Sequence, residues 1–217
     1  MMVKRMLMMV VGNFFIGVAV SLFRLSSFGT DPYTTMNLGI SGFINMQFGI
    51  YQLIINIFLL GFVWLFGRSH IGSGTVVNMV CIGFIADFFV YLYGNMIDGT
   101  LTYSMRISIM LIAVLIAGIA VALYITADLG VAPYDAMALI IAKVTNDKVP
   151  FAWARIMTDV TCVVIGFSFG ATVGIGTVIT AFFTGPIVQF FKVHVAEPML
   201  RSRSITDQKA AINVSKG

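Results

Sequence analysis

A five-residue motif occurs twice in this chain, and its surroundings recur with it. Gly29-Thr-Asp-Pro-Tyr33 returns as Gly130-Val-Ala-Pro-Tyr134, a shift of 101 residues. Flanking residues that match at the same shift are Gly17 and Gly118, Val20 and Val121, Leu22 and Leu123, Met36 and Met137, Leu38 and Leu139, and Ile40 and Ile141. Self-similarity at one spacing over so many positions indicates an internal duplication, so the fold is expected to contain two copies of one unit.

A second matched segment extends the duplication toward the end of each copy. At a shift of 102 residues, Gly72-Ser-Gly-Thr-Val76 lies over Gly174-Ile-Gly-Thr-Val178. We therefore expect a first repeat at 1–98, a second at 99–193 and a tail at 194–217. The tail is polar and lacks periodicity, so we expect it to be disordered.

The composition indicates a membrane protein. The chain is 59% hydrophobic and only 10% charged, whereas a soluble domain carries about 25% charged residues. The net charge of +4 comes from Lys and Arg that lie between and after the apolar runs, which is a topology signal rather than a sign of nucleic-acid binding. Cys81 and Cys162 lie in apolar segments without CxxC spacing, so we expect small packed side chains rather than a disulfide or metal site.

Six apolar runs are long enough to cross a bilayer as helices, which takes ~20 residues. They are 6–27, 50–67, 73–94, 105–127, 150–169 and 173–193. Long unbroken apolar runs do not fit the alternating pattern of a membrane β-barrel. The expected fold is therefore all-α and polytopic.

A short amphipathic helix is expected after each motif. Apolar residues recur at helical spacing at Tyr33, Met36, Ile40, Phe43 and Ile44, and again at Tyr134, Met137, Ile141 and Val144. About three turns are too few to cross the bilayer, which predicts short broken or re-entrant helices. Pro32 and Pro133 suit the first helical position, and Asp31 suits the N-cap.

The distribution of basic residues predicts the topology. With the N-terminus inside, the cytoplasmic face receives Lys4, Arg5, Arg68, His70, Lys143, Lys148, Lys192, Arg201 and Arg203, and the outer face receives Arg24 and Arg106. This is a positive-inside bias with both termini cytoplasmic. Three spans per copy make the two repeats inverted relative to each other, a plan common in secondary transporters. If the motif helices themselves cross, the count becomes eight and the repeats are parallel.

The fifth apolar run carries the strongest candidate site. Arg155 and Asp159 are four residues apart and share one helix face, with Asp159 near the bilayer midplane. A charge there costs ~2.5–3.5 kcal/mol even on the lenient insertion scale, so it should face the protein interior. The corresponding positions of the first repeat are Gln52 and Asn56. One interpretation is a substrate or proton site between the repeats, and the other is a self-neutralised structural ion pair.

Three further acids and the motif prolines complete the candidate set. Asp87 in the third run favours a snorkelling or capping role over coupling. Asp31, and Asp135 just past Pro133, could cap the motif helices, whose N-termini could otherwise attract an anion. Two broken helices at matched positions favour a functional site at Pro32-Tyr33 and Pro133-Tyr134-Asp135.

Taken as a set, these motifs resemble the YczE/YyaS/YitT-like family of bacterial integral membrane proteins, over residues 5–193. Members typically show an aromatic–acid pair after Gly-x-x-Pro. The second copy keeps Tyr134-Asp135, whereas the first has Tyr33-Thr34 and carries its acid at Asp31. The resemblance implies a multi-pass protein of the bacterial plasma membrane and supplies no substrate.

The sequence thus favours a small-solute or ion transporter with a polar site between the repeats. Alternatives are the substrate-binding membrane subunit of an ATP-driven importer and a non-transporting scaffold or regulator. Expected partners are the lipid bilayer, a small-molecule or ion substrate, and a second copy or a partner membrane subunit, with no nucleic acid. The motif Gly39-Ile-Ser41-Gly42 resembles that of intramembrane serine proteases, but no histidine lies in a suitable helix, so we expect no enzyme activity. No cofactor or metal is expected.

Overall fold

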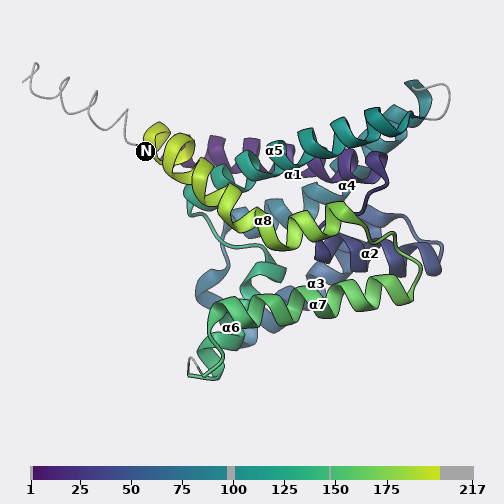
Figure 1. Ribbon diagram of the computed structural model, residues 1–217. Coiled ribbons are helices and arrows are strands. Elements are labelled where there is room, and N and C mark those ends of the chain that lie inside the picture. Colours follow the sequence, from purple (N-terminus) through teal and green to yellow (C-terminus); the bar gives the residue numbers. More distant parts are fainter. Residues whose placement is uncertain (1, 97–100, 147, 201–217) are drawn as a thin grey trace, which may run out of the picture.

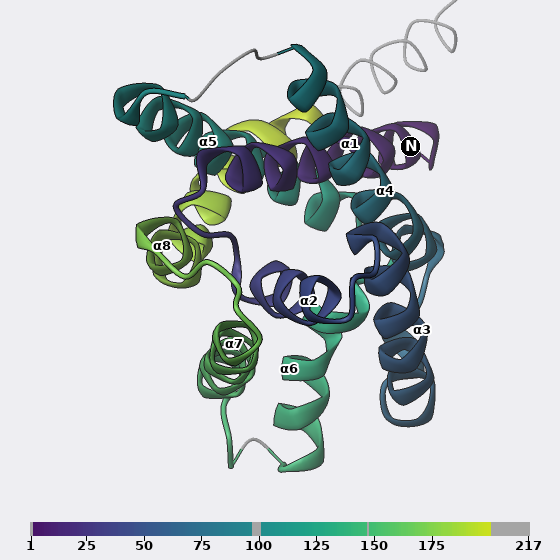
Figure 2. The ribbon, with the colours of Figure 1, turned by 90° about the vertical axis from the view of Figure 1, so that its right-hand side faces the viewer.

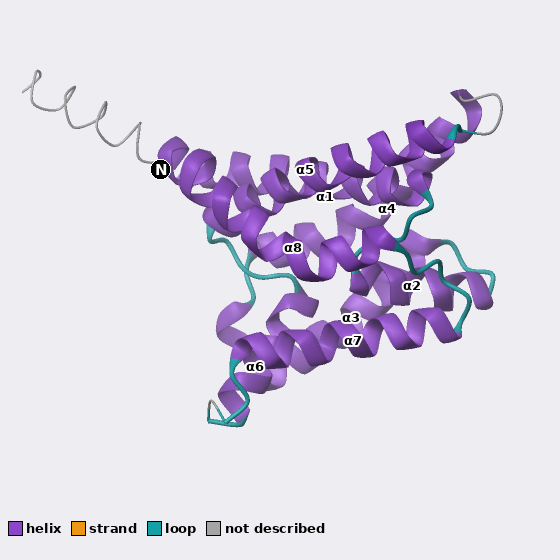
Figure 3. Cartoon of the chain, viewed as in Figure 1, coloured by secondary structure: helices purple, strands orange, loops and turns teal. Residues whose placement is uncertain are grey.

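A computed structural model describes residues 2–96, 101–146 and 148–200, and these residues form helices joined by short loops, without a strand (Figure 3). The α-helices are α1 Met2–Ser26, α2 Pro32–Phe43, α3 Phe48–Phe66, α4 Ser73–Met96, α5 Tyr103–Ala127, α6 Pro133–Val144, α7 Phe151–Ser168 and α8 Ile175–Phe191. A 3-10 turn, Arg68–His70, follows α3, and a π-helical turn, Lys192–Ala196, follows α8. The all-helical fold class is confirmed.

Five helical segments are long and apolar enough to cross a membrane, among the described residues. They are Met2–Ser26, Phe48–Phe66, Ser73–Met96, Tyr103–Ala127 and Ile175–Leu200. Helix α7, which covers the expected run 150–169, is not among these five. The count of six spans therefore stays a prediction.

The two motif helices have the predicted length and start. Helices α2 and α6 each contain 12 residues, or about 18 Å of rise, against ~30 Å of hydrocarbon. Each begins at a buried proline and ends at an exposed apolar residue, Phe43 or Val144. Proline at the first helical position loses no hydrogen bond there, because that N–H has no partner in the helix.

The loops around the motif helices repeat their backbone conformations. Positive φ angles occur at Ser27 and Asp128, and again at Asn45 and Asn146, each pair 101 residues apart. Asn and Asp are the non-glycine residues that best tolerate this conformation. The duplication seen in the sequence therefore extends to the turns that end α1 and α5 and to those that end α2 and α6.

Each motif helix packs against a helix of the other repeat. Helix α2 packs on α7, and α6 packs on α3, while α1 and α5 share the most extensive contact in the fold. Gly39 and Gly166 let α2 and α7 approach closely, because a methyl group on Gly39 would lie 2.4 Å from the Gly166 carbonyl oxygen. Val63 and Ile140, both almost fully buried, fill the contact between α3 and α6. Figure 2 shows α2 in the middle of the molecule and α6 below it, between α7 and α3.

The Gly-x-Gly-Thr turns hold the two repeats together. The Gly74 N–H donates to the Leu129 carbonyl over 2.7 Å, and the Gly176 N–H donates to the Phe28 carbonyl over 2.8 Å. These two bonds join equivalent residues, so each Gly-x-Gly-Thr turn is bonded to the loop that precedes the motif helix of the other repeat. We call each of these two contacts a clasp.

The two clasps lie at different ends of the molecule. Figure 1 shows the turn between α3 and α4 at the left, with both the start of α1 and the end of α8, and the turn between α7 and α8 at the right. The predicted disordered tail is wrong at its start, because the helix that contains α8 continues through the π turn to Leu200. The rest of that tail, 201–217, lies outside the described residues.

Candidate functional site

Two tyrosines, one from each motif, meet at the centre of the molecule. The rings of Tyr33 and Tyr134 stack with centroids 4.5 Å apart and an interplanar angle of 15°. Both are buried, and Cys162 of α7 packs beside them. Because they are equivalent residues of the two repeats, their contact marks the place where the copies face each other.

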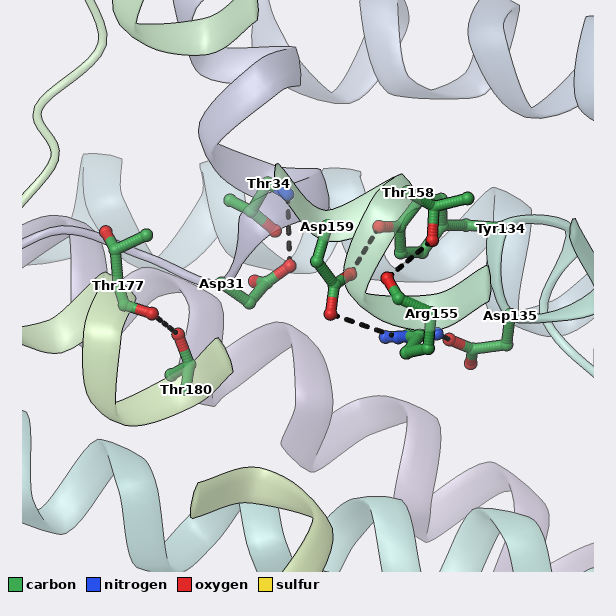
Figure 4. Close-up of polar contacts among 9 residues, drawn as sticks. All are labelled: Asp31, Thr34, Tyr134, Asp135, Arg155, Thr158, Asp159, Thr177 and Thr180. Carbon is green, nitrogen blue, oxygen red and sulfur yellow. Dashed lines mark hydrogen bonds and ion pairs between the residues drawn. The ribbon is translucent and has the colours of Figure 1, made fainter. Parts of the chain in front are cut away.

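Each tyrosine hydroxyl donates a hydrogen bond to a buried polar side chain of its own repeat. The Tyr33 hydroxyl donates to Asn56 Oδ1 over 2.8 Å. The Tyr134 hydroxyl donates to Asp159 Oδ1 over 2.5 Å, as Figure 4 shows. Asn56 is 2% exposed and Asp159 is 9% exposed. Asn56 and Asp159, which occupy matched positions of the two repeats, thus both bond the stacked tyrosines.

Arg155 joins two acids of the second repeat. Its guanidinium lies 2.5 Å from Asp135 and 3.3 Å from Asp159, and it stands over the Tyr134 ring at 4.9 Å. The predicted pairing of Arg155 with Asp159 on one helix face is confirmed. At the equivalent positions the first repeat has Thr34 and Gln52, which carry no charge.

Asp31 adds a carboxylate to the same cluster from the first repeat. It caps α2, because its Oδ1 accepts a hydrogen bond from the Thr34 N–H over 3.0 Å. Its side chain also points toward Asp159, close enough for the two charges to interact (Figure 4). The second repeat has Ala132 at this position and no side-chain cap.

The cluster carries more negative than positive charge. Among the described residues, Asp31, Asp135 and Asp159 contribute three carboxylates and Arg155 contributes the one guanidinium. The positive end of α2 offsets part of the Asp31 charge. Asp159 is 9% exposed, and a buried charge is costly unless it is paired, so the excess of carboxylates would suit a proton or another cation.

One family model matches most of this chain. The model of a family of unknown function, DUF6198, covers residues 3–193. The chain belongs to this family. It is similar to the uncharacterized membrane protein YczE of Bacillus subtilis, with 28% identity over 183 residues that cover 82% of each protein. An uncharacterized protein of Haemophilus influenzae is 28% identical over 176 residues, covering 81% of this chain and 78% of that protein.

The predicted resemblance to YczE and YyaS is confirmed for this DUF6198 member. YyaS of Bacillus subtilis, also uncharacterized, is 24% identical over 181 residues, covering 83% of this chain and 89% of YyaS. No solved structure matches the chain. The relatives and the five apolar helices together identify an integral membrane protein.

Asp87 lies apart from the central cluster of this DUF6198 chain. Its Oδ2 accepts a hydrogen bond from the Gly49 N–H over 2.7 Å, at the start of α3. Its Oδ1 lies 2.6 Å from Arg24, which also stands over the Phe48 ring. The contacts favour the capping role that the sequence suggested, with an added ion pair between α1 and α4.

Two further candidates of the first repeat, Pro32 and Gln52, take no part, among the described residues, in the hydrogen bonds and ion pairs of the central cluster. Pro32 and its counterpart Pro133 are both buried at the start of a motif helix. Pro32 also lines a pocket beside Asp159. Gln52 is buried, and its Oε1 has no hydrogen-bond partner within the described part of the chain. In place of the Arg155 network, the first repeat therefore holds an amide with an open acceptor.

Sequence reasoning missed an amide pair between α1 and α4. Asn78 donates to Asn13 Oδ1 over 2.8 Å, and Asn13 donates to the Met9 carbonyl over 2.9 Å. Both side chains are buried in helices that are otherwise apolar. An asparagine inside a predicted span is itself a signal of an interior position, because lipid would leave its amide unsatisfied.

Proposed function

We propose that this protein is a secondary transporter of a small solute or ion, with Asp159 as the residue that exchanges the coupling cation. The observation that carries the proposal is the charged network of Tyr134, Asp159, Arg155 and Asp135 at the contact between the repeats. An ionisable residue inside a membrane helix is a functional-site hypothesis by default, and here its partners are all named.

An inverted arrangement of the repeats supports the proposal. The turn between α3 and α4 and the turn between α7 and α8 lie at opposite ends in Figure 1, which fits two copies that face opposite sides of the membrane. Binding sites between inverted repeats are typically built around broken helices. Helices α2 and α6 fill this role, because each starts at a buried proline near the stacked tyrosines.

The charges also support the proposed orientation, with both termini in the cytoplasm of a bacterial cell. Basic residues occur near the start of α1, in the turn after α3 and near the end of α6, all of which lie at the left in Figure 1. Arg24 and Arg106 lie near the opposite end, where the Arg106 side chain donates to the Ser26 carbonyl. The positive-inside rule then assigns the left end to the cytoplasm.

The test begins with a thermal-shift screen of metabolites and ions on the purified protein, because a ligand that binds the folded state raises its melting temperature. Each stabilising compound is then assayed for uptake into proteoliposomes under an imposed pH or sodium gradient. Gradient-driven uptake is the expected result. Binding without flux would favour a subunit of an ATP-driven importer, and neither binding nor flux would favour a scaffold.

Asp159→Asn identifies the coupling residue. The variant should fold, because the first repeat already contains a neutral pair of the same kind, Tyr33 with Asn56. Arg155 keeps Asp135 as its partner. We expect gradient-driven uptake to fall at least tenfold, while the elution profile and melting behaviour stay close to those of the wild type. Unchanged uptake would remove Asp159 from the mechanism.

A further inference from the structure

The two repeats differ in how their last two helices pack. Helices α3 and α4 lie against each other along an extended contact, whereas their counterparts α7 and α8 make no such contact within the described residues. Figure 2 shows α7 and α8 separated at the left of the molecule. The duplication predicts equal packing in both copies, so the opening in the second repeat requires its own explanation.

An apolar pocket of about 190 Å³ occupies this opening. Its outer wall includes Val160 and Val164 of α7 with Val178 and Phe182 of α8, and all four side chains are more than half exposed. With α7 as the predicted sixth span, the exposed apolar side chains of α7 and α8 face lipid. The pocket therefore opens sideways toward the bilayer rather than toward either aqueous end.

One acidic residue, Asp159, lies at the inner end of the pocket. Asp159 and Pro32 form part of its lining, so the pocket reaches the central cluster. Asp31 lies next to Pro32 and faces Asp159, while Arg155 extends away from Asp31 toward Asp135 (Figure 4). A ligand that enters between α7 and α8 therefore meets apolar walls first and the Asp159 carboxylate last.

We propose that the pocket between α7 and α8 is a lateral entrance that admits an amphiphilic organic cation from the bilayer and places its charge beside Asp159. The ligand class follows from the lining: an apolar body matches the valine walls, and a quaternary or protonated amine matches the Asp159 carboxylate. The biological role of this entrance rests on the proposed transport function. Binding itself requires no flux, so the two can fail separately.

Matched positions of the first repeat supply controls. Val178 lines the pocket, and its counterpart Val76 lies on α4, with exposed fractions of 52% and 51%. Val160 also lines the pocket, and its counterpart Ile57 lies on α3, with exposed fractions of 56% and 55%. A tryptophan at Val178 or Val160 would fill the pocket, whereas a tryptophan at Val76 or Ile57 would add the same bulk elsewhere on the lipid-facing surface.

The experiment measures equilibrium binding of tritiated benzyltrimethylammonium to the full chain in lipid nanodiscs. We expect the Kd to rise at least tenfold in Val178→Trp and in Asp159→Asn and to stay within twofold of the wild type in Val76→Trp. Unlabelled benzyltrimethylammonium should compete, and benzylsulfonate, which has a similar body and the opposite charge, should not. If Val178→Trp does not yield folded protein, Val160→Trp with Ile57→Trp as its control replaces that pair.

Three results would overturn the lateral entrance: no saturable binding in the wild type, equal affinity in the pocket variants and their controls, or equal competition by benzylsulfonate. The last result would leave an apolar cleft for lipid tails. Saturable binding without gradient-driven uptake would refute transport and keep the pocket. Uptake that depends on Asp159 but is insensitive to tryptophan at Val178 or Val160 would refute the pocket and keep transport.

Discussion

The clasp between Gly74 and Leu129 depends on Gly130, and the loss of stability on replacing Gly130 can be worked out from its surroundings. Gly130 has φ +111°, and a methyl group there would lie 2.6 Å from the Gly72 nitrogen and from Thr75 Oγ1. A left-handed backbone costs a non-glycine residue about 1–2 kcal/mol, and overpacking costs about 1–3 kcal/mol. Weakening the neighbouring bond from Gly74 to Leu129 adds about 1 kcal/mol. Gly130→Ala should therefore destabilise the protein by about 3–6 kcal/mol.

Gly170 provides the control for backbone strain alone. Its φ is +86°, yet no atom lies within 4 Å of an added methyl group, so Gly170→Ala should cost only about 1–2 kcal/mol. Gly42, which has ordinary φ and open space around it, should tolerate alanine without loss. Gly29 is the repeat-one equivalent of Gly130, with φ +95° and the Gly174 nitrogen 2.9 Å from an added methyl group, so Gly29→Ala should behave like Gly130→Ala.

The assay is the melting temperature of the detergent-purified protein, followed by the fraction that stays monodisperse after heating. At about 2–4 °C per kcal/mol for a chain of this size, Gly130→Ala should lower the melting temperature by about 6–24 °C and Gly170→Ala by about 2–8 °C. Equal melting temperatures for these two variants would refute the clasp, because the difference between them isolates the contact with the other repeat.

Three further changes test the site and the topology. Tyr134→Phe should cost about 1.5–3 kcal/mol, because it removes a donor from a buried carboxylate, whereas Tyr33→Phe removes a neutral bond and should cost about 0.5–1.5 kcal/mol; melting temperatures check the order, and a larger loss for Tyr33→Phe would contradict it. Asp87→Asn should lower the melting temperature and leave the affinity for any identified ligand unchanged, so altered affinity would place that acid in the site. In a cysteine-free background, Ser69→Cys and Ala171→Cys should react with an impermeant maleimide from opposite sides of the membrane, and labelling from one side would refute the inverted repeats.

Much of the fold follows from local patterns in the sequence. The apolar runs set the long helices, and proline at the first helical position sets the start of α2 and α6. The pairing of Arg155 with Asp159 follows from their spacing of four residues on one helix. These features depend on residues close together in the chain, so periodicity and spacing are sufficient to find them.

The contacts between repeats could not be predicted in the same way. The sequence aligned Asn56 with Asp159, but nothing in it indicated that Tyr33 and Tyr134 would stack and bond these two residues. That geometry arises because each motif helix packs on a helix of the other copy. Such long-range packing is not determined by local sequence patterns. The separation of α7 from α8 could not be predicted from the duplication either, because the matched helices α3 and α4 pack together.

The asymmetry of the central site follows from the cost of buried charge. Because the Tyr33 and Tyr134 rings are in contact, the partners of their hydroxyls share one buried region. A carboxylate at both Asn56 and Asp159 would set like charges together in a medium of low dielectric constant, where their repulsion is weakly screened. An amide in one copy and an acid in the other keeps both hydroxyl bonds and leaves one acid, rather than two, bonded to the stacked tyrosines. If the repeats face opposite sides of the membrane, Asp159 belongs to one copy but lies at the contact between the two.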